Sequence, residues 1–492
     1  MRVCFVYPDI GGMERYGAHK YYHGLGYLSS VLKLAGHDAH LLYLDHQPEE
    51  DEFLQRLARV GPQLLAFSAT THQYPYVEQC ARWTKQAMPG LSTCVGGTHP
   101  TLVPQQVVAN HDLDYVCLGE GEYPLQELAT ALEEGRSCEQ IANLWLRRDG
   151  NVVQNRLRPL LQDLDALPFP DRELFGFEQI LAKNGGWVDL MAGRGCPYSC
   201  TYCSNPGLRA RYKGLGHYVR FRSVPNLVAE IRALDARYAI KTLNFQDDVF
   251  TLDRDWVLQF SAAYRAEFRF PFWINSRVER IVDEEVIAAL ARAGCCGVRI
   301  GLESGNEELR AQVLKRRMSN NEIRRAFALA RRYGLDVYTC NMLGVPGETA
   351  DMIKETIALN RELEPAGMQF SVFYPYPMTE LHDVCVEKGY LSEDSRLNSY
   401  YARKSVLQLP TLSQAELERE YDRFTALKAE LQMKRSSPWQ YRLYRALRVL
   451  CAGNAVAAQS VLHQMIRLKA AVARLLRRSR AIGQSAAQVA EE

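Results

Sequence analysis

The sequence predicts an α/β protein with three parts: an N-terminal doubly wound, Rossmann-like parallel sheet, a partial (β/α)6 barrel of the TIM type, and a helical C-terminal region. Short apolar, strand-like runs alternate with amphipathic helical patterns over the first 140 residues, and again from residue 188. Beyond residue 391 the patterns are helical only. We expect four segments, at residues 1–140, 141–185, 186–390 and 391–492.

Composition narrows the class of protein. Of the 492 residues, 47% are hydrophobic and 24% charged, as in ordinary globular proteins. A net charge of +2 gives no general attraction to nucleic acid. The thirteen cysteines are irregularly spaced, unlike a secreted disulfide framework. The apolar run at residues 1–8 is too short for a signal peptide, and no uninterrupted apolar stretch reaches the ~18 residues of a membrane span. We therefore expect a protein of the reducing cytoplasm.

The first region contains five strand-like runs between four helical patterns. The strands are expected at residues 3–7, 40–44, 64–68, 92–96 and 115–118, and the helices at 25–35, 50–59, 76–87 and 125–133. Ligands of such sheets bind outside the carboxyl ends of the strands. Those ends carry glycines and polar side chains that suit a binding site, namely Gly97, Thr98, His99, Gly119 and Glu120. No G-x-G-x-x-G follows the first strand, which disfavours a nicotinamide or flavin site.

The segment between the two α/β regions predicts a hairpin and a linker. Residues 144–153 form two alternating runs around Asp149-Gly150, a strong hairpin signal. Residues 164–171 contain Pro168 and Pro170 and predict an extended linker. Both could strap the first region against the second, but we favour the interpretation that they are plain connections.

The second α/β region predicts six strand–helix units. Strands are expected at 188–192, 242–246, 272–276, 297–302, 337–342 and 368–373, with helices at 225–237, 256–268, 284–293, 320–333 and 352–363. Six units are fewer than the eight of a closed TIM barrel, so we expect an open one. Its chemistry should lie at the carboxyl ends of the strands.

A cysteine-rich loop follows the first of these strands. Cys196, Cys200 and Cys203 are spaced C-x3-C-x2-C, and the next cysteine along the chain is Cys295. Three thiolates on one loop can hold three corners of a cubane iron–sulfur cluster and leave one iron open for chemistry. A structural zinc loop is the alternative, but it would need a fourth close ligand.

The loop from Gly193 to Cys203 resembles the signature of the radical S-adenosylmethionine (SAM) enzymes. The resemblance implies that the three cysteines bind a [4Fe-4S] cluster whose open iron takes the amino and carboxylate groups of SAM. It implies that the cluster's electron cleaves SAM to a 5′-deoxyadenosyl radical. It also implies that the backbone of Tyr202 meets the adenine.

Three further strand ends carry candidate SAM contacts under this resemblance. Asp247 and Asp248 follow the second strand, where one of the two would face SAM, with helix capping as the alternative. Arg277 follows the third strand and could pair with the SAM carboxylate, with a surface salt bridge as the alternative. Glu303 ends the fourth strand and matches an acidic position of the family. The G-x-P-G-E-T turn at 344–349 would lie near the adenine or serve only as a tight turn.

The first region resembles the cobalamin-binding domain that precedes one class of radical SAM enzymes. The matching pieces are Gly24-Leu25-Gly26-Tyr27-Leu28, Ala35-Gly36-His37, Gly96-Gly97-Thr98-His99-Pro100 and Gly119-Glu120-Gly121-Glu122. The D-x-H-x-x-G motif that brings a histidine beneath cobalt is absent, because Tyr43 stands where Asp38 and His40 would require glycine. We expect no histidine below the cobalt. His99 is a candidate pocket contact, with a capping or solvated loop histidine as the alternative.

The C-terminal region is helical and basic. Residues 434–480 contain many Lys and Arg residues and no Asp or Glu. Such a segment suits either an amphipathic helix on an anionic membrane surface or a solvated helix. No aromatic stacking pattern or zinc knuckle accompanies the charge, so we expect no nucleic acid partner.

Together the resemblances imply a cobalamin-dependent radical SAM methyltransferase that methylates an unactivated carbon through the deoxyadenosyl radical and methylcobalamin. Cyclisation or rearrangement with the same cofactors is the first alternative, and a non-catalytic cobalamin-binding sensor or scaffold is the second. A methylthiotransferase is disfavoured because its three further N-terminal cluster cysteines have no evident counterparts. The expected partners are a small-molecule or lipid-like substrate and an electron donor such as flavodoxin or ferredoxin. No residue identifies the substrate or a catalytic side chain.

Overall fold

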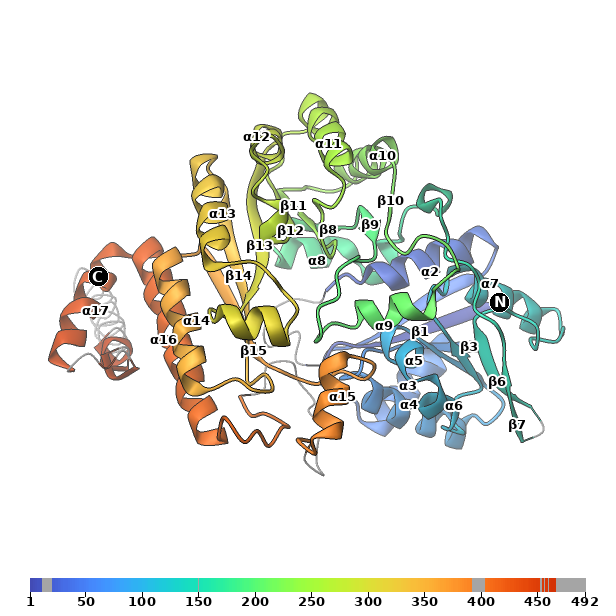
Figure 1. The fold of residues 1–492 in the computed structure, drawn as a ribbon. Coiled ribbons are helices and arrows are strands. Elements are labelled where there is room, and N and C mark those ends of the chain that lie inside the picture. The colour runs from blue at the N-terminus through green and yellow to red at the C-terminus, as the bar shows by residue number, and fades with distance from the viewer. Residues whose placement is uncertain are drawn as a thin grey trace, which may run out of the picture.

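The protein is described here by a computed structural model of residues 1–465, with residues 11–19, 149, 392–402, 452, 453, 455 and 459 outside the description. Two α/β units lie beside each other, and the last described helices extend from the second unit (Figure 1). The glycines at positions 11 and 12, which follow the first strand, lie outside the described residues, as does the tail beyond residue 465.

Within the described residues, the first sheet has seven strands in the order β2-β1-β3-β4-β5-β6-β7. The five predicted strands form its parallel part. They are β1 (Arg2–Pro8), β2 (Asp38–Leu44), β3 (Leu64–Ser68), β4 (Ser92–Gly96) and β5 (Tyr115–Cys117). The helices are α2 (His23–Leu34), α3 (Glu50–Val60), α4 (Tyr74–Ala87), α5 (Thr98–Leu102), α6 (Pro104–Val108) and α7 (Glu122–Glu133).

Helices cover both faces of this sheet, as a doubly wound fold requires. On one face, Leu25 of α2 and Leu128 of α7 pack in one cluster with Phe5 of β1. On the other, Phe53 of α3 and Val77 of α4 pack in a second cluster. Alternate residues of β1 therefore serve different cores, with Cys4 and Val6 in one and Val3 and Phe5 in the other, which explains why this strand is apolar at successive positions. The predicted doubly wound sheet is confirmed.

The predicted hairpin forms, but its interpretation as a plain connection is wrong. Strands β6 (Leu144–Arg148) and β7 (Asn151–Gln154) pair with each other, and β6 pairs antiparallel with β5. The hairpin thereby extends the first sheet and covers the edge that β5 would otherwise expose. The alternating pattern predicts a hairpin but contains no information about which edge receives it.

Within the described residues, the second sheet has six parallel strands in the order β15-β14-β13-β12-β11-β8, so the barrel is open between β8 and β15. Its strands are β8 (Trp187–Leu190), β11 (Thr242–Phe245), β12 (Phe272–Ser276), β13 (Cys295–Glu303), β14 (Asp336–Leu343) and β15 (Gly367–Val372). Its helices are α8 (Phe177–Lys183), α10 (Val224–Asp235), α11 (Arg254–Glu267), α12 (Glu284–Ala293), α13 (Asn320–Arg332) and α14 (Ala350–Leu363). The predicted partial barrel is confirmed.

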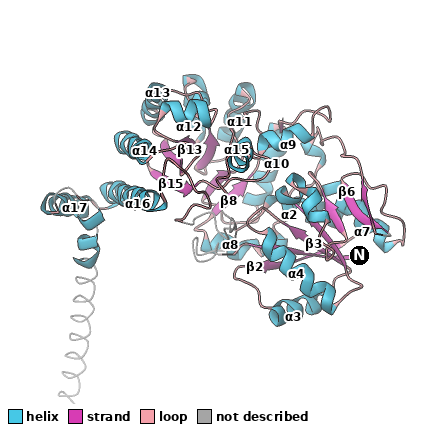
Figure 2. Ribbon diagram, turned by 60° about the horizontal axis from the view of Figure 1, so that its bottom comes forward, coloured by secondary structure: helices cyan, strands magenta, loops and turns pink. Residues whose placement is uncertain are grey.

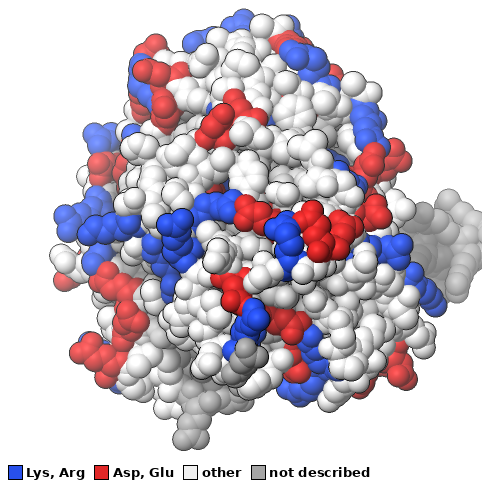
Figure 3. Space-filling model, turned by 90° about the vertical axis from the view of Figure 1, so that its right-hand side faces the viewer, with Lys and Arg blue, Asp and Glu red and all other residues white. Residues whose placement is uncertain are grey.

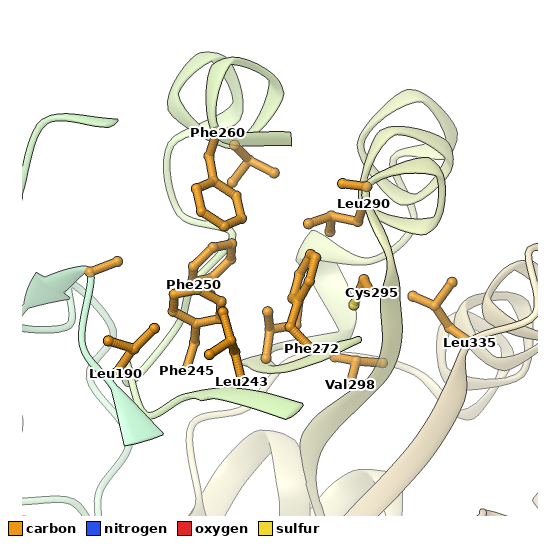
Figure 4. Packing of buried hydrophobic residues seen from close by; sticks show 14 of the residues in the cluster. Leu190, Leu243, Phe245, Phe250, Phe260, Phe272, Leu290, Cys295, Val298 and Leu335 are labelled. Carbon is orange, nitrogen blue, oxygen red and sulfur yellow. The ribbon is translucent and has the colours of Figure 1, made fainter. Parts of the chain in front are cut away.

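The barrel core lies between the strands and the surrounding helices. Figure 4 shows Phe245 and Phe272 from neighbouring strands meeting Phe250 and the helical Phe260. Phe245, Phe250, Phe260 and Phe272 are fully buried and meet edge to face or tilted, with ring centroids 4.7 to 5.8 Å apart. This packing fixes the strands whose carboxyl ends carry the polar residues described below.

Short elements connect the two units. They are the two-stranded ribbon of β9 (Gly193–Arg194) and β10 (Arg220–Phe221), the helix α9 (Asn205–Arg211), and the 3-10 turns η1 (Leu164–Ala166) and η2 (Glu173–Phe175). The turn η3 (Val278–Arg280) and the π-helical turn η4 (Leu309–Val313) follow β12 and β13. Figure 3 shows the face of the first unit, where acidic and basic side chains are interspersed.

The C-terminal helices are α15 (Glu380–Glu387), α16 (Gln414–Ser436) and α17 (Pro438–Leu450). A capping box of Ser413 and Glu416 starts α16, and Phe424 of this helix packs against Phe370 of β15. Helix α17 lies away from both sheets (Figure 2). Among the described helices, none combines the length and apolar character that a membrane crossing needs.

Candidate active site

A cavity of about 380 Å³ lies between the two units, at the carboxyl ends of their strands. Gly97, Thr98, Gly119 and Glu120 line it from the first unit, together with the ends of β3 and β4. From the second unit the lining includes Arg194, on the loop that carries the cysteines. Four of the five residues predicted to bind the first unit's ligand therefore meet in one cavity.

Two of these positions require glycine. Gly97 has φ +101°, and a Cβ there would lie 2.8 Å from the carbonyl oxygen of Ala69. Gly119 has φ +68°, and a Cβ there would lie 1.4 Å from the hydroxyl of Tyr212. Both conformations are unfavourable for other residues. The glycines bring backbone, rather than side chain, to the cavity wall.

His99 is buried beside the cavity, and the residues that line the cavity in the described structure do not include it. Its ring lies 4.4 Å from the ring of Tyr74, and its Nδ1 is 3.3 Å from the hydroxyl of Thr71. Burial lowers the pKa of His99 to about 4. A solvated loop histidine is therefore the wrong interpretation, and the proposed contact with a ligand remains a prediction without support from the geometry.

The cysteine loop begins where β8 ends. Cys200 is buried, and Cys196 and Cys203 are partly exposed. The backbone N–H of Asn205 points to Cys203 Sγ at 3.4 Å, and Arg277 Nη1 lies 3.2 Å from Cys200 Sγ. Donors of this kind stabilise thiolates that hold an iron–sulfur cluster. The three cysteines and the hydrogen-bond donors near their sulfurs thus fit a cubane cluster.

Among the described residues, no three His, Cys, Asp or Glu side chains converge on a single metal ion. A cubane takes each thiolate on a different iron, so its ligands need not converge on one point. The three predicted cluster cysteines therefore remain a prediction that rests on their shared loop and on the donors around their sulfurs.

The two aspartates at the end of β11 both hold the cysteine loop. Asp247 is buried and accepts hydrogen bonds from the backbone N–H groups of Ala192 at 3.1 Å and Gly193 at 2.6 Å. Burial raises the pKa of Asp247 to about 7. Asp248 accepts from the side-chain amide of Asn205 at 3.1 Å. The helix-capping alternative is wrong, because α11 is capped by Asp253.

Arg277 is buried beside the cysteine loop, so its interpretation as a surface salt bridge is wrong. Its guanidinium stacks on Tyr198, 3.8 Å from the ring centroid, and donates to Glu279 at 2.7 Å. With its other nitrogen it reaches Cys200. The side chain thus places a positive charge against the predicted cluster.

Glu303 ends β13 with φ +66°, where the pairing with β14 shifts register. Tyr202 donates its hydroxyl to Glu303 Oε1 at 2.9 Å, and Arg316 Nη1 donates to the same hydroxyl oxygen at 3.3 Å. Burial raises the pKa of Glu303, although Arg316 and Tyr202 oppose that shift. Sequence reasoning missed Arg316, because it follows η4, away from any predicted strand end.

The turn at residues 344–349 is held internally. Glu348 is fully buried and accepts from the backbone N–H groups of Gly344 at 2.6 Å and Val345 at 3.2 Å. Thr349 caps α14. Burial raises the pKa of Glu348 to about 8. These contacts account for the turn as local structure, and its nearness to an adenine remains a prediction.

Two family models match this chain. The radical SAM superfamily model matches residues 190–359, which contain the cysteine loop and most of the barrel. The B12 binding domain model matches residues 19–129, which contain the glycine-rich strand ends. The chain belongs to the radical SAM superfamily. Within it, the chain is a member of the class that carries an N-terminal cobalamin-binding domain.

Curated relatives resemble the chain over most of its length. An uncharacterized methyltransferase of Pyrococcus horikoshii is 27% identical over 372 residues, 75% of this chain and 79% of the relative. The cytidylyl-2-hydroxyethylphosphonate methyltransferase of Streptomyces wedmorensis is 24% identical over 450 residues, 80% of this chain and 83% of the relative. The anaerobic magnesium-protoporphyrin IX monomethyl ester cyclase of Rubrivivax gelatinosus is 26% identical over 395 residues, which are 77% of this chain and 69% of the relative.

Two solved structures share the fold. TsrM from Kitasatospora setae, a radical SAM methyltransferase with cobalamin and a [4Fe-4S] cluster bound, matches with a TM-score of 0.64 at 19% identity over 85% of this chain and 81% of that chain. OxsB, a cobalamin-dependent radical SAM enzyme, matches with a TM-score of 0.66 at 16% identity over 95% of this chain and 71% of that chain.

Proposed function

We propose that this protein is a cobalamin-dependent radical SAM methyltransferase that methylates an unactivated carbon of a small-molecule substrate. The observation that carries the proposal is the cavity that Gly97 and Gly119 of the first unit share with Arg194, two residues before Cys196. Cobalamin held there by the first unit would face the cysteine loop of the second, with the substrate between the two cofactors. Methyltransferases among the relatives support the reaction type.

We assign the cofactor contacts from the geometry above. Cys196, Cys200 and Cys203 would hold the [4Fe-4S] cluster, and Glu303 and Arg277 would face SAM beside it. Asp247 would keep the loop in place through its two backbone hydrogen bonds. When bound, the cluster supplies the electron that cleaves SAM, and cobalamin supplies the methyl group. The electron would come from a donor such as flavodoxin or ferredoxin.

The test uses full-length protein purified without oxygen and reconstituted with iron, sulfide and hydroxocobalamin. After desalting, we expect corrin absorption bands and about four irons per chain, as one cubane requires. Cys200→Ala should lose iron and keep the corrin. Cys296→Ala, a partly exposed cysteine at the opposite end of β13, is the matched control and should keep both. Iron without corrin in the wild type would contradict the proposal.

Cyclisation or rearrangement is the second candidate. The relatives include the magnesium-protoporphyrin cyclase and a 4′-phospho-dehydrooxetanocin synthase of Priestia megaterium, which are named for reactions other than methyl transfer. The mass of the product separates the two candidates. Methylation adds one methyl group to the substrate, whereas ring closure or rearrangement adds none.

We also propose that α17 contacts an anionic membrane surface, which would suit an amphiphilic substrate. Trp439, Val449 and Leu450 are exposed apolar residues of this helix, and Arg442 and Arg445 are exposed on it as well. The protein should sediment together with vesicles that contain phosphatidylglycerol, and should stay in the supernatant with vesicles of phosphatidylcholine alone. Changing both arginines to glutamine should abolish sedimentation. Equal sedimentation with both lipids would contradict the contact.

A further inference from the structure

A buried ion cluster joins the two units beside the cavity. Arg194 donates from Nη1 to Glu120 Oε1 at 2.9 Å and from Nη2 to Glu122 Oε1 at 2.6 Å. Its guanidinium also lies 5.1 Å from the ring centroid of Tyr27 on α2. The side chains of Arg194 and Glu122 are only 18% and 9% exposed. One arginine of the second unit is therefore enclosed by an acidic loop and an aromatic ring of the first.

A second arginine supports the same loop. Arg220 pairs with Arg194 across the β9–β10 ribbon, and its Nη1 lies 2.9 Å from Glu120 Oε1. The same nitrogen donates to the carbonyl oxygen of Leu161 in the connecting segment. Two arginines on one rigid ribbon thus hold one carboxylate. The side chains of Arg194, Arg220 and Glu120 are 18%, 6% and 20% exposed, unlike the exposed pairs that contribute little.

The position of this cluster along the chain gives it a role between the two cofactor sites. Arg194 precedes the predicted cluster ligand Cys196 by two residues. Glu120 lies on the loop that follows β5 and carries Gly119, and Glu122 begins α7 directly after it, so we call residues 119–122 the acidic loop. Arg194, Arg220, Glu120 and Glu122 all line the cavity. A ligand in the cavity therefore lies against both halves of the ion cluster.

We infer that Arg194 couples the two cofactor sites: cobalamin in the cavity holds the acidic loop in place, and Arg194 transmits that order to the cysteine loop. This inference rests on the proposed function. Arg194 is a positioning residue, because it acts through the loops that hold the cofactors. Coupling between the affinities of two sites is reciprocal, so bound cobalamin should tighten binding of the cluster and a bound cluster should tighten binding of cobalamin. We expect the tighter cluster binding to slow the loss of iron.

The experiment measures iron loss from the reconstituted protein to a coloured iron chelator, without oxygen, with and without hydroxocobalamin. In the wild type we expect cobalamin to slow iron loss by about fivefold or more, the lower end of measured couplings between sites. In Arg194→Met we expect the two rates to agree. The matched control is Arg232→Met. Arg232 lies on the exterior of α10 and pairs with Glu267, so cobalamin should slow iron loss in this variant as much as in the wild type.

Two further measurements guard against a variant that misfolds. Glu122→Gln keeps an oxygen acceptor for Arg194 but removes the charge, so it should reduce protection without abolishing it. Hydroxocobalamin affinity of each variant is measured by dialysis with the cluster present and absent. In the wild type the cluster should tighten hydroxocobalamin binding, and in Arg194→Met it should have no effect on that affinity.

The outcomes separate this inference from the function on which it rests. Wild-type protein that binds no corrin overturns the proposed function and the coupling together. Wild-type protein that binds corrin and loses iron equally fast with and without it overturns the coupling alone. Full cobalamin protection in Arg194→Met would show that the ion cluster does not transmit it, and would also overturn the inference.

Discussion

Tyr202 and Glu303 are joined by a hydrogen bond of 2.9 Å from the tyrosine hydroxyl to the carboxylate. The bond ties the residue before the last cysteine of the loop to the end of β13, 101 positions along the chain. Arg316 donates to the tyrosine hydroxyl and to the carbonyl oxygen of Gly301, which closes the arrangement. The side chain of Tyr202 therefore orients the acidic group that we assign to SAM.

Replacing Tyr202 with phenylalanine should weaken SAM binding by roughly fivefold, because one hydrogen bond contributes about 1 kcal/mol. Glu303 would keep its neighbour Arg316 but lose the bond that orients it. Equilibrium dialysis of SAM against reconstituted protein measures the change. Tyr333→Phe is the matched control, because it removes a tyrosine hydroxyl that donates to an exposed carboxylate, Glu284. Equal losses in the two variants would contradict the assignment.

Removing the charge of Arg277 should lower the reduction potential of the cluster. Reduction adds negative charge, and a guanidinium 3.2 Å from Cys200 Sγ favours that state. In Arg277→Met we expect a fall on the order of tens of millivolts, read from the cluster's paramagnetic resonance during a redox titration. Arg254→Met, which removes an exposed arginine paired with Asp283, is the control. An unchanged potential at full iron content would refute the role.

Alanine at Gly119 should disrupt the junction of the two units. Its Cβ would overlap the hydroxyl of Tyr212, in addition to the cost of φ +68°. Gly135→Ala isolates that second cost, because Gly135 has φ +66° with open space around it. The latter variant should lose about 1 kcal/mol of stability and no cobalamin affinity. Gly119→Ala should lose cobalamin affinity as well, and Tyr212→Ala in the same chain should restore part of it.

The carboxyl of Glu348 should make stability depend on pH. Its pKa is raised by burial from 4.5 to about 8, so the folded protein binds a proton more tightly than the unfolded chain does. Proton binding by Glu348 therefore adds to the free energy of unfolding below pH 4.5, and this contribution is lost progressively as pH rises toward 8. The loss is at most about 1.4 kcal/mol per pH unit. Above pH 8 the loss is complete.

Glutamine at position 348 removes this titration. The melting temperature of Glu348→Gln minus that of the wild type should increase from pH 5 to pH 8, as measured by scanning calorimetry. Glu308→Gln, at an exposed glutamate, controls for the general loss of a negative charge. A difference between Glu348→Gln and wild type that is the same at both pH values would speak against a buried titrating carboxyl.

Local patterns predict most of the fold because most strands are short apolar runs and most helices have an amphipathic period of their own. The strand over residues 64–68 is predicted at its full length, since all five of its residues are buried and the first four are apolar. Helices α5 and α6 escape prediction because five residues are too few to establish a helical period. The hairpin is visible, but its pairing with β5 depends on an edge that only the folded sheet creates.

The site is predicted less completely than the fold. Cys196, Cys200 and Cys203 stand out because three ligands share one loop. The roles of Arg194 and Arg316 do not, because Glu120 lies 74 positions from Arg194, and Tyr202 lies 114 positions from Arg316. Arginines are abundant, and nothing in their local sequence distinguishes a buried one. Only the meeting of distant segments reveals which guanidinium faces which acid.

The placement of β6 and β7 also has a consequence for synthesis on the ribosome. Every described strand of the first sheet lies within the first 154 residues. That sheet can complete its pairing and cover β5 while the barrel is still being translated. The acidic loop with Glu120 and Glu122 would then already be in place when the ribbon with Arg194 and Arg220 emerges. The earlier half of the molecule would thus serve as a template for docking the later half.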